Sequence, residues 1–202
     1  MIDEGYIKFA CDWTEGPPPP ETVLRELNET RQRMHALELI GHSEEDDVDF
    51  GNISIRGPEP GQLIISGTQT GHLAQLTADH YALVTDADIG GNRVACRGRV
   101  KASSETLTHA AIYALDPQIN GVIHVHALTQ WNRLLHRIPT TAPGIPYGTP
   151  AMATEFQRLY GGSDLPRLGV AAMGGHPAGI VSFGRHLAEA EQRLLDCLSV
   201  DS

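Results

Sequence analysis

The sequence predicts an α/β protein in which a mixed β-sheet is flanked by helices. Short apolar runs bounded by glycine, at 51–57, 61–67 and 121–127, have the length and β-branched content of strands. Longer segments rich in helix-forming residues lie at 21–40 and 185–198. The 202 residues contain no internal repeat and no clear domain boundary, so we expect strands and helices to pack in one layered domain.

The N-terminal part of the chain is expected to hold one helix between two irregular segments. Residues 1–16 show no clear hydrophobic period, and the four prolines at 17–20 predict a stiff, extended connector. Residues 21–40 combine helix formers with regularly spaced apolar side chains, so we expect a helix that ends near Gly41. The acidic segment HSEEDDVDF at 42–50 is expected to be a solvated loop.

Strands follow in the middle of the chain. The runs at 51–57 and 61–67 predict a hairpin, and residues 80–91 predict a further strand that ends in a turn. The next segment, 93–102, is the densest positive stretch of the chain. It carries Arg93, Arg97, Arg99 and Lys101. These side chains either supply a local positive potential or form a solvated strand edge.

The second half of the chain predicts three helices and at least two more strands. Residues 103–117 read as a helix with a serine at its N-cap. A loop rich in proline and glycine at 136–150 leads to a helical segment at 152–160. The stretch 168–184 has the apolar character of one or two buried strands interrupted by glycines, and an amphipathic helix closes the chain at 185–198.

Composition limits the partners and the compartment. The formal net charge of −10 argues against a nucleic-acid backbone or an anionic membrane surface as the main partner. No apolar run approaches the 18 or more residues of a membrane span, and no signal peptide is recognisable. The three cysteines, Cys11, Cys96 and Cys197, are scattered and odd in number, which fits a reducing cytoplasm rather than a disulfide framework. We therefore expect a cytoplasmic protein with a small-molecule partner.

Three histidines are candidate metal ligands. His124 and His126 stand two residues apart in the apolar run GVIHVHA, so in a strand they point to the same face. His176 lies among glycines in MGGHPAGI, which suits a backbone that must approach another segment closely. Three neutral imidazoles would leave a divalent cation with its full charge and an open position, as in catalytic sites. The alternative is that these histidines only make hydrogen bonds in a wet patch.

Glu105 is a candidate acid/base, and several small residues are candidate anion ligands. Glu105 follows Ser103 and Ser104 at the start of a predicted helix, where a glutamate also interacts favourably with the helix dipole. Beside a metal that activates a carbonyl group, the same carboxylate could transfer a proton. Helix N-termini and glycine-rich turns such as GNIS and SGTQTG can hold anions through their amides.

Taken together and in order, these motifs resemble the class II aldolase/adducin family. They are GNIS, LIISGTQTG, HYALV, SSETLTHAAIY, VIHVHA, YGTPAMA and MGGHPAGIVSFG. The resemblance covers residues 21–198, with residues 1–20 as an N-terminal extension that contains the proline-rich connector. It implies a three-layer α/β/α fold with a central, mostly antiparallel sheet. It also implies a homotetramer with active sites at subunit interfaces, and a divalent metal such as Zn²⁺, Mn²⁺ or Co²⁺.

By position, the resemblance assigns roles to individual residues. It makes His124, His126 and His176 the metal ligands and Glu105 the catalytic acid/base. It also matches Asn52, Ser103 and Ser104 to residues that hold the substrate phosphate, and it places the family's Thr-Gly phosphate loop at Gly67 and Thr70–Gly71. We therefore expect the loops around these positions to bind an anionic substrate group, with six candidate ligands: Asn52, Ser66, Gly67, Thr68, Ser103 and Ser104. The chain departs from the family where His176 is followed by Pro177 rather than glycine. It departs again after VIHVHA, where the segment is short and no counterpart of the aldolase tyrosine is found.

The expected function is that of a metal-dependent carbon–carbon lyase. The substrate would be a small anionic hydroxy-carbonyl compound or sugar phosphate, cleaved or condensed through an enediolate that the metal stabilises. An epimerase or a dehydratase could use the same site. Two alternatives of other classes are a non-catalytic, adducin-like interaction module and an iron oxygenase with two histidines and Glu105 as ligands, in which His176 would stand apart.

Overall fold

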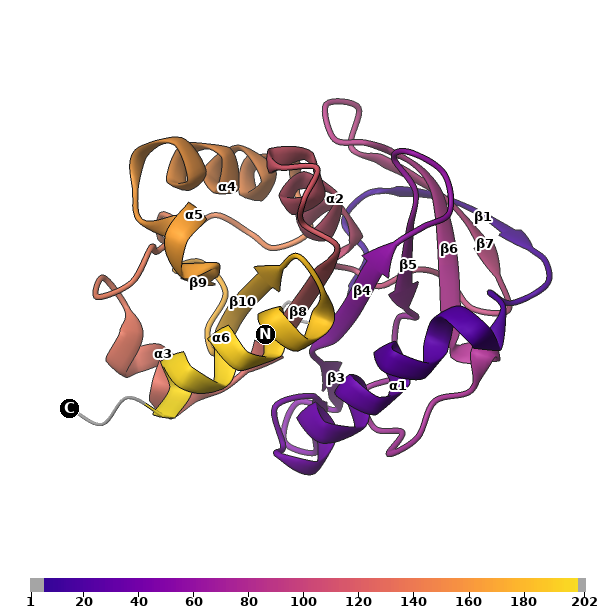
Figure 1. Ribbon diagram of the computed structural model, residues 1–202, viewed down its shortest axis with the longest axis horizontal. Coiled ribbons are helices and arrows are strands. Elements are labelled where there is room, and N and C mark those ends of the chain that lie inside the picture. The colour runs from indigo at the N-terminus through magenta and orange to yellow at the C-terminus, as the bar shows by residue number, and fades with distance from the viewer. Residues whose placement is uncertain (1–5, 200–202) are drawn as a thin grey trace.

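The computed structural model describes residues 6–199, which form an eight-stranded sheet with helices on both faces (Figure 1). The sheet order is β1-β7-β6-β5-β4-β8-β10-β9, and only the edge pair β1 and β7 is parallel. The strands are β1 (Ala10–Glu15), β4 (Asn52–Arg56), β5 (Leu63–Ser66), β6 (Tyr81–Asp88), β7 (Arg93–Gly98), β8 (Gly121–His126), β9 (Val170–Ala172) and β10 (Gly179–Gly184). The expected α/β class and the mostly antiparallel sheet are therefore confirmed.

Helices cover the two faces of this sheet and create two hydrophobic cores. The helices are α1 (Glu21–Ala36), α2 (Thr106–Leu115), α3 (Leu128–Leu134), α4 (Pro150–Gly162), α5 (Leu165–Leu168) and α6 (Leu187–Ser199). One core joins α1 and α6 to Ile53, Ile123 and Val125, and α1 and α6 lie on the same side of the sheet in Figure 1. The other joins α2 and α4 to the opposite face, which includes Val122 and Val181. Strand β8 alternates between the two cores, so each face carries every second side chain.

Most expected elements are present, with shifted boundaries. The hairpin of β4 and β5, the strand β6, the strands β9 and β10, and the helices α4 and α6 all form where the sequence predicted them. Helix α1 ends at Ala36 rather than near Gly41, since Glu38 adopts a positive φ of 58°. Helix α2 begins at Thr106 with Glu105 at the N-cap, so the expected serine cap is wrong.

Four segments were assigned wrongly or missed by sequence analysis. The acidic segment 42–50 is not a loop throughout, because β2 (Gly41–Ser43) and β3 (Val48–Phe50) pair as a small antiparallel ladder. The N-terminal segment, which shows no hydrophobic period, contributes β1 to the main sheet, with its first five residues outside the described part. The short helices α3 and α5 were not expected.

Two further expectations concern the chain as a whole. Cys11, Cys96 and Cys197 are all free thiols, as their scattered positions predicted. Within residues 6–199, no helix is both long enough and apolar enough to cross a bilayer.

Candidate metal centre and active site

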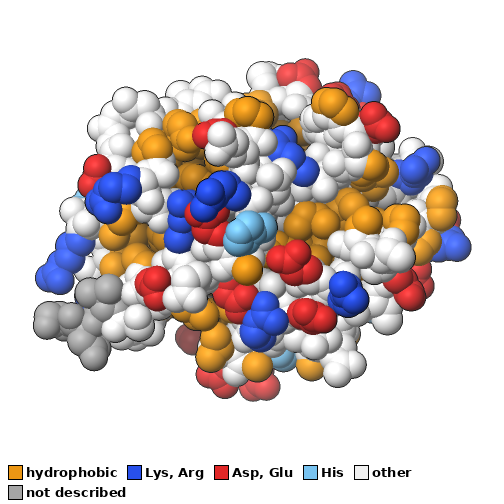
Figure 2. Space-filling model, viewed as in Figure 1, with side chains coloured by type: hydrophobic (Ala, Val, Ile, Leu, Met, Phe, Trp, Pro, Cys, Tyr) orange, Lys and Arg blue, Asp and Glu red, His pale blue; other side chains and the backbone are white. Residues whose placement is uncertain are grey.

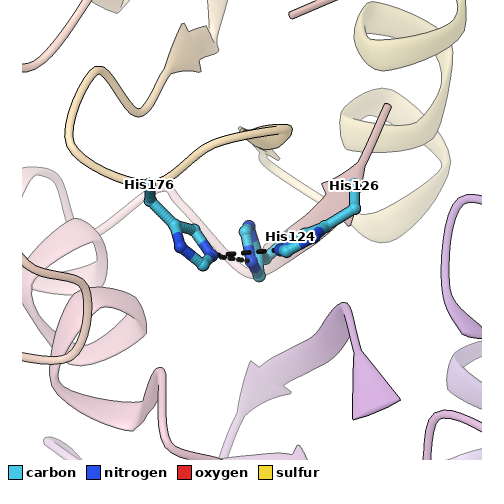
Figure 3. Close-up of side chains that lie close together, drawn as sticks. All are labelled: His124, His126 and His176. Carbon is cyan, nitrogen blue, oxygen red and sulfur yellow. Dashed lines mark hydrogen bonds between the residues drawn. The ribbon is translucent and has the colours of Figure 1, made fainter. Parts of the chain in front are cut away.

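The three candidate ligands meet at one point on the α2/α4 side of the sheet. The Nε2 atom of His176 lies 3.0 Å from Nε2 of His126 and 3.3 Å from Nε2 of His124. Figure 3 shows the three rings directed toward one another, two from β8 and one from the segment between β9 and β10. His124 and His176 are buried and His126 is half-buried. The predicted convergence of the three imidazoles is thus observed.

Strand pairing and glycine content explain why His176 reaches the pair. In the antiparallel register, His126 lies opposite Gly179, so the segment that precedes β10 crosses the end of β8. A Cβ atom on Gly179 would lie 2.4 Å from the His176 ring, and one on Gly175 would lie 2.3 Å from the Ile145 carbonyl oxygen. Because side chains at these positions would collide with their neighbours, glycine is what permits the close approach.

Contacts around the rings fix their orientation. The Nδ1 atom of His124 lies 3.3 Å from the carbonyl oxygen of Ile180, to which it can donate, and this leaves the Nε2 lone pair for a ligand. The ring of His126 stacks on Phe50 with centroids 5.2 Å apart, and the ring of His176 packs 4.7 Å from that of Tyr147. The imidazoles are therefore held in place by packing before any ion arrives.

The spacing of the nitrogen atoms fits a divalent cation. Two nitrogens bound to a tetrahedral zinc at about 2.0–2.1 Å lie roughly 3.4 Å from each other. The observed separations of 3.0 and 3.3 Å are close to that value. Three neutral imidazoles with no thiolate ligand are also the donor set of catalytic rather than closed structural sites. The residues present therefore fit a metal ion held by His124, His126 and His176.

Glu105 stands beside this cluster. Its Oε1 atom lies 3.6 Å from Nε2 of His176 and 3.8 Å from Nε2 of His124. Thr108 donates a hydrogen bond of 2.6 Å to the other carboxylate oxygen, Oε2. Within the described residues, buried Oε1 has no hydrogen-bond partner. One oxygen is thus fixed and the other is directed at the place where the histidines meet.

Burial controls the protonation of the whole cluster. It raises the pKa of Glu105 to about 7, against smaller lowering effects from Thr108 and Lys8. The same loss of hydration lowers the pKa of His124 to about 4 and holds those of His126 and His176 well below 6.5. At neutral pH the imidazoles are uncharged and ready to bind a cation, while Glu105 is close to half-protonated.

The raised pKa of Glu105 predicts a pH-dependent stability of the metal-free protein. A carboxyl group with a pKa of about 7 when folded and 4.5 when unfolded favours folding below pH 4.5, and this contribution is lost as the pH rises through 7. We expect the free energy of unfolding of metal-free wild type, relative to Glu105→Gln, to fall by roughly 3 kcal/mol between pH 4.5 and 8. Urea unfolding at both pH values measures this difference.

The exposed Glu59→Gln variant is the matched control, because it removes a carboxylate that is not buried. A difference between wild type and Glu105→Gln that is the same at both pH values would contradict the raised pKa.

A cavity of about 720 Å³ gives access to the cluster. Its walls include His126, His176, Phe50, Tyr147 and Lys8. The Nζ atom of Lys8 lies 3.3 Å from the centre of the Tyr147 ring, and its charge lowers the pKa of Glu105 and of His176. Sequence analysis missed Lys8, because nothing local in an irregular segment signals a contact with a residue 139 positions away.

A small polar pocket lies next to the metal cluster. Asn52 pairs with His124 across β4 and β8, so the two sites are adjacent. The pocket is lined by Asp49, Gly51, Asn52, Gly67, Thr68, Gln69, Thr70, Gly71, Ser103 and Ser104. Buried Oδ1 of Asn52 has no hydrogen-bond partner within the part of the chain that the structure describes. Five of the six predicted anion ligands are thus brought together.

The sixth, Ser66, is placed elsewhere. Its hydroxyl oxygen accepts a hydrogen bond of 3.2 Å from the backbone N–H of Ile53, within the sheet, and it does not line the pocket. The prediction of Ser66 as an anion ligand is therefore not supported, because the end of β5 turns its side chain toward β4.

Two other sequence hypotheses receive an answer. The positive stretch does not form a free strand edge, because β7 is paired on both sides, with β1 and with β6. Arg93 and Arg99 make ion pairs with Asp12 and Glu15 of β1 and do not line the polar pocket. The iron-oxygenase arrangement required His176 to stand apart from the pair. Its position within 3.3 Å of His124 shows that this hypothesis is wrong.

Comparison with known structures supports the fold. An L-fuculose 1-phosphate aldolase superposes with a TM-score of 0.65 at 18% identity, over 90% of this chain and 85% of that chain. A sugar-phosphate aldolase from Thermotoga maritima gives a TM-score of 0.67 at 19% identity, over 88% and 91%. YgbL from Escherichia coli, described as a putative aldolase/epimerase/decarboxylase, gives a TM-score of 0.66 at 18% identity, over 88% of this chain and 86% of that chain.

Sequence comparison gives the family. The L-ribulose-5-phosphate 4-epimerase UlaF of Salmonella paratyphi B is 28% identical over 92 residues, which are 45% of this chain and 38% of that protein. The chain thus matches well under half the length of this curated relative. The family model for the class II aldolase and adducin N-terminal domain matches residues 31–197, most of the chain. The protein therefore belongs to the class II aldolase/adducin family.

Proposed function

We propose that this protein is a divalent-metal-dependent lyase that cleaves or forms a carbon–carbon bond in a small anionic hydroxy-carbonyl compound or sugar phosphate. The observation that carries the proposal is the buried carboxylate of Glu105, with a pKa near 7, placed within 3.6–3.8 Å of two converging histidine nitrogens. A non-catalytic role would not require all three histidines and this carboxylate to be retained in one cluster.

The residues of the chain divide the reaction between them. Bound to His124, His126 and His176, a divalent cation, for which we propose Zn²⁺, would act as a Lewis acid that polarises the carbonyl group of the substrate. Glu105 can take a proton from substrate or return it, since a pKa near the working pH suits both directions. Thr108 fixes the orientation of the Glu105 carboxylate by donating a hydrogen bond to its Oε2 atom. The polar pocket at Asn52 and Ser104 would hold the anionic group of the substrate.

The test of the proposal is a product analysis by NMR. Metal-loaded protein is mixed with sugar phosphates and with hydroxy acids, and spectra are followed for fragment aldehydes, with Glu105→Gln as the blank. Fragments that appear only with wild type support the lyase. Interconversion of stereoisomers without fragments would instead support the epimerase alternative, which the similarity to the UlaF epimerase favours, and loss of water would support a dehydratase.

The same proposal includes assembly into a homotetramer with active sites at subunit interfaces. Leu128, on the wall of the metal cavity, has an exposed fraction of 58%, which is high for a large apolar side chain at the mouth of a site. A neighbouring subunit that covers this residue would also complete the cavity. Sedimentation of the metal-loaded protein, compared with Leu128→Glu, tests this, and an unchanged monomer in both would contradict it.

Asn52→Ala is expected to raise KM about tenfold to hundredfold without loss of metal. The amide group of Asn52 lines the polar pocket and can hydrogen-bond to an anionic group bound there. A hydrogen bond to a charged group contributes about 1.5–3 kcal/mol. Ser66→Ala is the matched control, because Ser66 is a buried polar residue at the end of the neighbouring strand β5 that does not line the pocket. Steady-state kinetics together with metal content measure the effect. A KM that rises equally in both variants would indicate a general disturbance rather than lost anion binding.

A further inference from the structure

A second cavity, of about 460 Å³, lies between α3, α5, β9 and α6. None of its lining residues lines the cavity of the metal centre or the polar pocket. Hydrophobic side chains form part of its wall. They are Leu134, Ile138, Leu168 and Val170. An apolar wall with a few polar groups at its edge is the usual composition of a small-molecule site.

Four arginines meet at this cavity. They are Arg133, Arg137, Arg167 and Arg193, and Asp196 is the one acidic residue in the lining. The whole chain has only 15 basic residues against 25 acidic ones. Figure 2 shows Lys or Arg side chains around hydrophobic ones over α3, α5 and α6, on the left of that view. The cavity is thus a local concentration of positive charge in an acidic protein.

Two of the arginines are held in place by the fold. Arg133 donates a hydrogen bond of 2.7 Å to the carbonyl oxygen of Leu198, and Arg193 donates one of 2.9 Å to the carbonyl oxygen of Phe183. Gly169, with a φ of 62°, makes room for Arg193, since a Cβ atom there would lie 2.3 Å from Nη1 of that arginine. These guanidinium groups are oriented by main-chain contacts rather than by solvent alone.

The charge of the arginines is only partly balanced. Arg167 pairs with Asp164 at 2.8 Å and Arg193 with Glu189 at 3.0 Å. Among residues 6–199, Arg133 and Arg137 make no ion pair, and the buried Nε atom of Arg133 has no hydrogen-bond partner. An anion in the cavity would therefore meet guanidinium groups whose charge the protein itself balances only in part.

We propose that this cavity is a second binding site, for a small organic anion that carries a carboxylate or phosphate on an apolar body. The arginines would bind the charged group and the wall around Leu134 would bind the apolar part. Planar guanidinium groups match both carboxylate and phosphate, so the two head groups share one chemistry.

Isothermal titration of the metal-loaded full chain tests the proposal. Hexanoate and hexyl phosphate are the probes and separate the two head groups, while hexanol and inorganic phosphate each lack one half of the recognised chemistry. We expect at least one of the two amphipathic anions to bind more tightly than both controls. Equal binding of hexanol, or binding of inorganic phosphate alone, would overturn the proposal.

Variants locate the binding. Arg137→Gln changes an exposed side chain and is expected to weaken binding about tenfold, because one charge-assisted hydrogen bond is lost. Leu168→Trp fills the cavity and should abolish binding. Arg185→Gln is the matched control, since Arg185 is an exposed arginine close to α6 that does not line the cavity. Equal affinities for wild type and both cavity variants, or a change of oligomeric state in Arg137→Gln, would overturn the assignment.

Discussion

His124→Ala is expected to release the metal and to abolish turnover. His124 lies in the middle of the sheet, and its Nε2 atom meets that of His176 at 3.3 Å. Loss of one of three ligands removes about 3 kcal/mol or more of binding energy, which is on the order of a hundredfold in affinity. Metal content after dialysis, measured by mass spectrometry beside kcat, gives the result.

The control for this variant is His186→Ala, which removes an exposed histidine that is remote from the cluster. It should keep one equivalent of metal and wild-type turnover. If His124→Ala retained one tightly bound metal per chain, the three-histidine centre would be refuted, and the proposed lyase would lose its Lewis acid.

Glu105→Gln is expected to lower kcat by about a hundredfold to ten-thousandfold while the metal stays bound. The amide has nearly the size of the carboxylic acid and can still accept the hydrogen bond from Thr108, but it cannot exchange a proton with substrate. Rapid-quench or steady-state kinetics measure kcat, and metal analysis shows that the ligands are intact.

Thr108→Val separates chemistry from positioning. It leaves the carboxyl group in place but removes the bond that aims it, so we expect a smaller loss of rate and a further rise in the pKa of Glu105. Full activity of Glu105→Gln on a substrate that wild type cleaves would exclude Glu105 as the acid/base.

Local sequence patterns predicted much of the fold. Alternation in the β8 segment placed His124 and His126 on one face, and the same alternation puts Ile123 and Val125 in the opposite core. Glycines around His176 correctly indicated a close backbone approach, which the structure shows at Ile145. These features depend on neighbouring residues alone, so they can be read from the chain.

What could not be predicted depends on distant partners. The acidic segment 42–50 forms β2 and β3 although its composition favours a loop, and Phe50 at its end stacks on His126. β1 has no apolar period because its side chains lie at an edge of the sheet, largely exposed. Ser66 stands beside the glycine-rich turn in the sequence, so it was predicted to bind an anion. In the fold its hydroxyl oxygen instead accepts a hydrogen bond from the backbone N–H of Ile53 on the neighbouring strand.

The cluster is built from parts of unequal stiffness. Strand β8, which carries two of the imidazoles, is hydrogen-bonded on both sides, to β4 and to β10. The third imidazole belongs to His176, in the short connection before β10. Adjustment to ions of different radius therefore falls to that connection, while the paired imidazoles keep their spacing. We therefore expect that the three histidines could accept divalent cations of different radius without repacking of the interior.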